Sequence, residues 1–174
     1  MTGREARESL RSTSLKLMAT DPSALPKTIA GVRIATSLFF LLFGEYKLAG
    51  PAFAHEAFEG YLHDYIAKTA VGFYRPVLSG LVLPHAVFFG YTVGVVEFLI
   101  GISLLLGLWV RPAAVLGILF LLNLTLAGWW EPGYGAPVWR YFGARLDTVP
   151  LMLLLIIFYA ADAGRVWGLD GRRT

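Results

Sequence analysis

Glu97 is the residue whose type and position in this sequence most strongly suggest chemistry. It is the only Asp, Glu, Lys or Arg in an apolar stretch that runs from about His85 to Trp109. An ionisable side chain in such a stretch usually faces other helices and marks function. Three interpretations stay open at this point: a hydrogen bond that joins helices, a ligand or proton site, and a contact between copies of the chain.

Glycines share one helical face with Glu97. Gly90, Gly94, Glu97 and Gly101 stand at positions i, i+4, i+7 and i+11, which form a single stripe on an α-helix. Gly90 and Gly94 are a Gly-x-x-x-Gly pair, a spacing that lets two helices approach closely. The stripe therefore predicts that Glu97 faces other helices and that Gly94 contacts one of them.

Depth in the membrane selects Asn123 as the expected partner of Glu97. Counted from the cytoplasmic helix ends, Glu97 and Asn123 lie about 18 and 17 Å deep, whereas Arg33 lies at about 8 Å and Lys47 at about 28 Å. Both cations thus miss Glu97 by about 10 Å, more than a long side chain comfortably spans. We expect a neutral Glu97 carboxyl, since apolar surroundings disfavour the charged form, in contact with Asn123.

Charged residues also mark the ends of the first and last apolar stretches. Arg33 and Lys47 share a face of the first stretch, and Asp147 and Asp162 share a face of the last one. If the two faces meet, Arg33 forms a structural ion pair with Asp162, and Lys47 approaches Asp147. Simple ion pairing is the default interpretation of both pairs.

The cations expected at the outer end, beneath a rim of aromatic residues, suit an anion or a quinone head group. The candidate residues of this quinone- or anion-binding site are Glu97, Asn123, Lys47, Arg75, Arg145 and Asp147. Quinone is the candidate cofactor, and no covalently bound cofactor is expected. The sequence shows no catalytic nucleophile motif, nucleotide-binding loop or convincing set of metal ligands.

Composition places these residues in a membrane protein. The chain has 174 residues, of which 56% are hydrophobic and 16% charged, and its mean hydropathy is +0.61. Such a composition excludes disorder and argues against a soluble globule. The absence of cysteine excludes disulfides, thiolate metal sites and covalent c-type haem. Basic residues are scattered rather than clustered, so a nucleic-acid partner is not expected.

The predicted fold is all-α, a four-transmembrane-helix bundle with an amphipathic interfacial helix between the first two spans. The spans are expected at about 28–49, 85–109, 112–130 and 146–162, inside a transmembrane domain of residues 28–164. The fourth is short for a bilayer that needs about 20 apolar residues. Residues 1–27 form a polar cytoplasmic segment, and residues 165–174 a basic cytoplasmic tail. Apolar residues spaced as on a helix between Phe53 and Ile66 predict the interfacial helix.

Lysine and arginine counts give the orientation. Nine lie on the side of the termini, against five on the opposite side: Lys47, Lys68, Arg75, Arg140 and Arg145. The positive-inside rule then places both termini in the cytoplasm. We expect a multi-pass protein of a bacterial or archaeal inner membrane, with the lipid bilayer and other membrane subunits as its partners.

Three ordered motifs and Arg33 give the chain a family resemblance over about residues 28–172. The motifs are Gly44-Glu-Tyr-Lys47, then Val96-Glu-Phe98 with Leu106-Gly-Leu-Trp-Val-Arg-Pro-Ala-Ala114, and Ala163-Gly-Arg-Val-Trp-Gly-Leu-Asp170. Together they resemble the DoxX/DoxD family of small four-helix integral membrane proteins. The long loop after the first span and the aromatic loop after the third are more similar to the DoxD branch.

The resemblance implies the fold strongly and the chemistry loosely. DoxD-like members are described as subunits of a thiosulfate:quinone oxidoreductase, whereas most DoxX-like chains have no assigned activity. We favour a non-catalytic accessory subunit of a quinone-linked redox complex, respiratory or photosynthetic, because this chain lacks a redox centre of its own. The alternatives are a DoxD-like subunit that binds quinone or a sulfur oxyanion, and a small-molecule or proton transporter.

Overall fold

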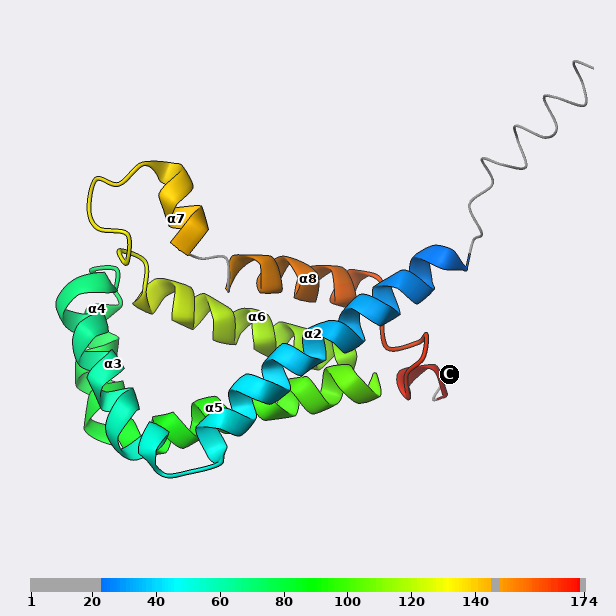
Figure 1. The fold of residues 1–174 in the computed structure, drawn as a ribbon, viewed down its shortest axis with the longest axis horizontal. Helices are drawn as coiled ribbons and strands as arrows, with labels where there is room; N and C mark the ends of the chain where they lie inside the picture. Colours follow the sequence, from blue (N-terminus) through cyan, green and yellow to red (C-terminus); the bar gives the residue numbers. More distant parts are fainter. Residues whose placement is uncertain (1–22, 145–147, 173–174) are drawn as a thin grey trace, which may run out of the picture.

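The computed structural model describes residues 23–144 and 148–172, and every regular element in these ranges is a helix. The α-helices are α2 (Ala24–Leu48), α3 (Phe58–Asp64), α4 (Arg75–Val77), α5 (Ala86–Leu106), α6 (Val110–Ala127), α7 (Val138–Ala144) and α8 (Val149–Ala160). Tighter or wider helical turns are η1 (Phe53–Ala57), η2 (Tyr65–Thr69), η3 (Leu78–Val82), η4 (Leu83–His85) and η5 (Asp170–Arg172). Helices α2, α5, α6 and α8 run along the length of the molecule, with α3 and α4 at one end and the C-terminal segment at the other (Figure 1).

Three helical stretches are long and apolar enough to cross a membrane: Ala24–Leu48, Arg75–Leu106 and Val110–Ala127. The chain is therefore a multi-pass membrane protein, and the all-α prediction is confirmed for the described residues. The second stretch begins ten residues before its predicted start, because Pro84 lies in the first turn of η4, where proline is tolerated. Helix α8 is apolar but has only 12 residues.

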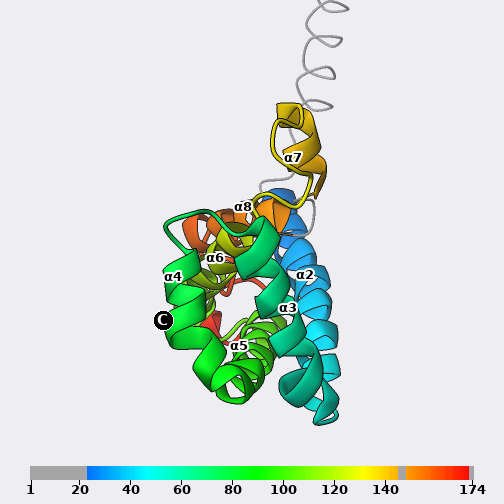
Figure 2. The same ribbon diagram turned by 90° about the vertical axis from the view of Figure 1, so that its left-hand side faces the viewer.

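The segment between the first two stretches is helical from Phe53 to Thr69, through η1, α3 and η2. It buries Ala54, Phe58 and Leu62, whereas Glu59 and His63 are exposed. This division into an apolar and a polar face is the predicted amphipathic pattern. The segment lies across one end of the long helices, as Figure 2 shows from that side.

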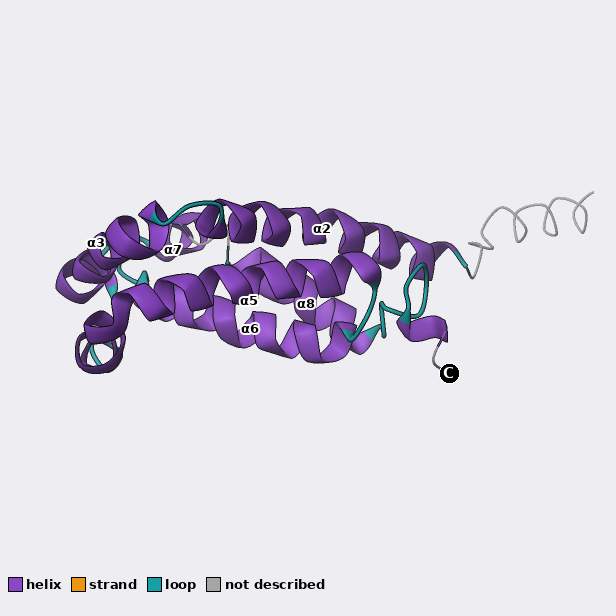
Figure 3. Ribbon diagram, turned by 90° about the horizontal axis from the view of Figure 1, so that it is seen from below, coloured by secondary structure: helices purple, strands orange, loops and turns teal. Residues whose placement is uncertain are grey.

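Glycines set the distance between α2 and α5, which lie side by side in Figure 3. A Cβ atom added to Gly44 would lie 2.7 Å from the backbone nitrogen of Phe98, and one added to Gly101 would lie 2.8 Å from Cγ of Leu41. A Cβ on Gly94 would meet Leu48 at 3.0 Å. The prediction that the glycine stripe faces another helix is confirmed. Helices α6 and α8 form the second closely packed pair.

Side chains of the four long helices, α2, α5, α6 and α8, form one apolar core. Its largest buried members are Phe40, Ile100, Leu104, Leu121, Leu155 and Phe158. A second cluster, around Phe58 and Leu62, fills the space between α3 and the adjoining end of α5. The long helices thus present their inner faces to one another and leave their outer faces apolar and exposed.

Gly94→Leu is expected to destabilise the protein, because the added side chain has no room beside Leu48 and Lys47. Overpacking of this kind costs about 1–3 kcal/mol. Leu99→Ala is the matched control on the same helix, since Leu99 is 55% exposed. Thermal unfolding of the detergent-solubilised protein measures both variants. Equal midpoint shifts would contradict the close contact at Gly94.

Candidate functional site

Lys47 and Glu97 form a buried ion pair where α2 crosses α5. The Lys47 ammonium nitrogen, Nζ, lies 2.6 Å from Oε1 and 2.5 Å from Oε2 of Glu97. The side chains are only 16% and 6% exposed, respectively. The ammonium also lies 5.5 Å from the ring centre of Phe53 and 6.0 Å from that of Phe43. These contacts leave the pair enclosed by apolar and aromatic groups.

The prediction that Glu97 contacts Asn123, with no cation in reach, is wrong. The expected depths assume aligned helix ends, whereas α2 and α5 pack along their length with their ends offset, so that Gly44 lies against Phe98 and Leu41 against Gly101. At the crossing, a Cβ on Gly94 would lie 3.1 Å from Cβ of Lys47, so Lys47 is level with Gly94. Gly94 is three residues, or about 4.5 Å, from Glu97 along α5, which a lysine side chain easily spans.

Asn123 belongs to a different polar pair. Its Oδ1 accepts a hydrogen bond of 2.5 Å from the Tyr74 hydroxyl, and its Nδ2 donates one of 2.7 Å to the Leu119 carbonyl. Burial raises the pKa of the Tyr74 phenol, which therefore stays protonated and able to donate. Asn123 and Tyr74 line a cavity of about 300 Å³ between α3, η3, α5 and α6.

Lys47 lines two cavities, an inner and an outer one. The inner one, of about 150 Å³, is also lined by Glu97 and by Thr148. The outer one, of about 460 Å³, is lined by Lys47 and by aromatic side chains, among them Phe43, Tyr46, Phe53, Phe58, Tyr61 and Tyr65. Lys47 and Glu97 thus both line the inner cavity, and Lys47 also lines the aromatic outer cavity.

Arg75, another predicted site residue, does not join Lys47. Arg75 donates from Nε to the Ala70 carbonyl at 3.0 Å and from Nη2 to the Tyr134 hydroxyl at 3.1 Å. It lines neither cavity beside Lys47. Arg145 and Asp147 lie outside the described residues, so the predicted approach of Asp147 to Lys47 stays a prediction.

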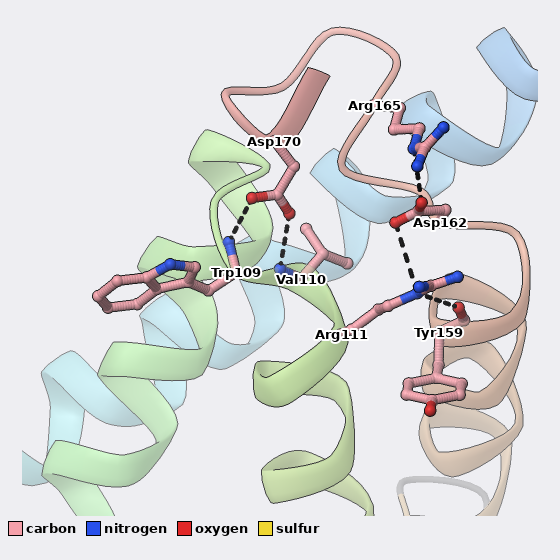
Figure 4. Close-up of polar contacts among 7 residues, drawn as sticks. All are labelled: Trp109, Val110, Arg111, Tyr159, Asp162, Arg165 and Asp170. Carbon is pink, nitrogen blue, oxygen red and sulfur yellow. Dashed lines mark hydrogen bonds and ion pairs between the residues drawn. The ribbon is translucent and has the colours of Figure 1, made fainter. Parts of the chain in front are cut away.

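The predicted ion pair between Arg33 and Asp162 is also wrong. Asp162 instead pairs with Nε of Arg165 at 2.6 Å and with Nε of Arg111 at 3.5 Å (Figure 4). The reason is that α8 packs on α6 rather than on α2, and the chain reverses at Asp162, where φ is +50°. Asp162 therefore faces the start of α6.

Arg33 is fully buried under the C-terminal segment 163–172. Its Nη2 donates to the Trp167 carbonyl at 3.0 Å, whereas Nε and Nη1 have no partner among the described residues. A Cβ on Gly168 would lie 2.8 Å from Nη1, and one on Gly107, where φ is +60°, would overlap it. Both positions therefore require glycine, which explains why these glycines flank the arginine.

Asp170 has a role at the start of α6 that its place in the sequence motif did not predict. Its two carboxylate oxygens accept hydrogen bonds from the backbone nitrogens of Trp109 (2.8 Å) and Val110 (3.0 Å), at the start of α6 (Figure 4). The backbone nitrogens of Leu169 and Asp170 donate to Leu106 and Gly107. The sequence contains one indication of this role. Trp109 precedes α6, and its side chain offers no acceptor for the first amides of the helix, so another residue must supply one.

Comparison with known proteins places this geometry in a family. The sequence model of the DoxX family matches residues 28–130, a range that includes most of α2, all of α5 and α6, and both members of the Lys47–Glu97 pair. No curated protein and no solved structure is similar enough to this chain to count as a match. Helix α8 and the C-terminal segment over Arg33 lie beyond the matched range.

Removing one partner of the Lys47–Glu97 pair is expected to destabilise the protein strongly, because the other charge stays buried. Glu97→Gln and Lys47→Met should each cost about 3–5 kcal/mol, and the double variant much less than their sum. A double-mutant cycle on thermal unfolding in detergent measures the coupling. Lys68→Met is the control, since the exposed Lys68–Asp64 pair should contribute below about 1 kcal/mol. Additive single effects would show that the two charges are not coupled.

Asp170→Ala is expected to lower the free energy of unfolding by about 1–2 kcal/mol, because two amides at the start of α6 lose their acceptor. Asp170→Asn, which keeps one acceptor oxygen, should fall between the wild type and Asp170→Ala. The measurement is again thermal unfolding, with the exposed Glu56→Ala as control. If Asp170→Ala unfolds with the wild-type midpoint, the carboxylate does not stabilise this end of the protein.

Proposed function

This chain belongs to the DoxX family of membrane proteins, and we propose that it is a non-catalytic accessory subunit of a quinone-linked redox complex, respiratory or photosynthetic. The observation that supports this role most directly is the mutual neutralisation of Lys47 and Glu97. Both carboxylate oxygens of Glu97 contact the ammonium of Lys47, so the pair joins α2 to α5. The chain also contains no cysteine, and thus no thiolate ligand for an iron–sulfur cluster.

The proposed placement in the membrane has four spans and both termini in the cytoplasm of a bacterial or archaeal cell. The excess of lysine and arginine on the side of the termini supports this orientation. Helix α8 is the fourth span, and its 12 residues reach about 18 Å, so the bilayer must thin there or adjoining residues must extend the span. The amphipathic segment from Phe53 to Thr69 then lies at the outer surface.

The outer faces of the long helices supply the surface for partners. Large apolar side chains are exposed along them, including Leu38, Phe39 and Leu42 on α2, Phe88 and Leu99 on α5, and Leu119 on α6. Such faces require lipid or another membrane subunit, since exposed apolar patches of this extent are unfavourable in water. An accessory subunit would use part of this surface to pack against the larger complex.

A second candidate role is the DoxD-like one, in which the chain itself binds quinone or a sulfur oxyanion. This role is favoured because Lys47, besides contacting Glu97, also lines the aromatic cavity of about 460 Å³. A quinone ring or an anion in this cavity would approach Lys47 from a space that Glu97 does not line. Arg75 would take no part, because its guanidinium binds Ala70 and Tyr134 instead.

Purification of the tagged full-length chain from native membranes in mild detergent tests the proposal. We expect redox subunits to copurify in fixed proportion, and the Lys47→Met/Glu97→Gln double variant to keep quinone-reducing activity within about twofold of the wild type. Lys68→Met serves as the control for nonspecific effects on assembly. Purification without any redox subunit would contradict the accessory role. An intact complex that loses more than tenfold of its activity in the double variant would favour the DoxD-like role.

A further inference from the structure

The cavity beside Asn123 is separate from the Lys47–Glu97 pair and has no part in the proposed function. It lies between α3, η3, α5 and α6 and has a volume of about 300 Å³, at the lower end of the range for small-molecule sites. Phe58, Leu78, Phe89, Val93 and Phe120 are among the side chains that form its apolar wall. Neither Lys47 nor Glu97 lines it.

The entrance of the cavity faces outward from the helices. Val77 and Leu81, which line it, are 42% and 54% exposed, and Asn123 is exposed as well. Val77 and Leu81 belong to the helical stretch Arg75–Leu106, which is apolar enough to span a membrane. Asn123 and Phe120 belong to α6, another stretch apolar enough to span a membrane, so the side of the entrance beside the exposed Asn123 faces the bilayer, where the most abundant molecules are lipids.

Asn123, which pairs with Tyr74 in this apolar wall, keeps one hydrogen-bond donor that no described group accepts. The Thr92 hydroxyl is occupied by the Phe88 carbonyl within α5. Asn123 uses one hydrogen of its amide on Leu119, and its carbonyl accepts from Tyr74. An amide nitrogen carries two hydrogens, and the second one has no partner among the described residues, so it can donate to a ligand carbonyl.

Asn123 lies in the last part of α6, closer to the end of the helix than to its middle. It is four residues from Ala127, the last residue of the helix, which is about 6 Å along the axis. Ester carbonyls mark the boundary between the hydrocarbon core and the head groups, and an unsatisfied donor at this depth is costly. We propose that the cavity holds the acyl chain of a membrane lipid, whose ester carbonyl accepts a hydrogen bond from the Asn123 amide.

A photoreactive monoacylglycerol with a diazirine on its chain tests this assignment on the full-length protein in dodecyl maltoside. We expect saturable labelling of cavity residues such as Val93 and Phe120, with competition by unlabelled monoacylglycerol. The matching alkyl ether, which lacks the carbonyl, should compete about fivefold more weakly, the effect of one neutral hydrogen bond. Asn123→Leu should raise the half-saturating probe concentration by the same factor, and Val93→Phe should block labelling by filling the cavity.

Leu116→Ala, on an exposed position of α6, is the matched control and should bind the probe like the wild type. Equal competition by ester and ether would overturn the role of the carbonyl, and this comparison uses only the wild-type protein. Labelling outside the cavity would overturn the site. Displacement of the probe by a short-chain quinone at concentrations where monoacylglycerol has no effect would overturn the choice of a lipid as the ligand.

Discussion

The close crossing of α2 and α5 is the constraint on which the rest of this structure depends. Glycines at positions 44, 94 and 101 let the two helices approach so closely that an added Cβ would lie about 3 Å or less from the facing helix. The crossing places Lys47 within hydrogen-bonding distance of both oxygens of Glu97 in a setting where either charge alone would be expensive. The close packing of the two helix backbones therefore makes the buried ion pair possible.

The opposite end of the bundle manages a buried charge differently. Arg33 is fully buried, and no carboxylate of the described residues contacts it directly. It binds the Trp167 carbonyl and lies against two glycines, and the negative charge of Asp170 acts on it from a distance. Asp170 in turn is held by the first amides of α6. The positively polarised N-terminus of α6 and the Arg33 guanidinium thus both interact with the Asp170 carboxylate. The short segment 163–172 covers this end of the bundle.

Much of the fold follows from local patterns in the sequence. The apolar stretches, the glycine stripe and the amphipathic segment each depend on residues close together in the chain, and the structure confirms their helices. The pairing of charges depends instead on how helices cross. Helices with aligned ends separate Lys47 from Glu97 by about 10 Å, whereas the observed offset of α2 along α5 brings Lys47 level with Gly94, about 4.5 Å from Glu97 along the helix. The partner of Arg33 could not be predicted either, because it is a backbone carbonyl, and every residue offers one.

The segment 163–172 has a consequence for the order in which the protein is completed during synthesis. Arg33 enters the membrane with the first helix, but the carbonyl that it binds and the glycine that it lies against belong to residues made more than 130 positions later. Until the ribosome has produced that segment, the guanidinium must stay in contact with water or lipid head groups at the membrane boundary. The first helix is therefore expected to settle at its final depth only after residues 163–172 have been translated, so the partners of its buried charge come from a much later part of the chain.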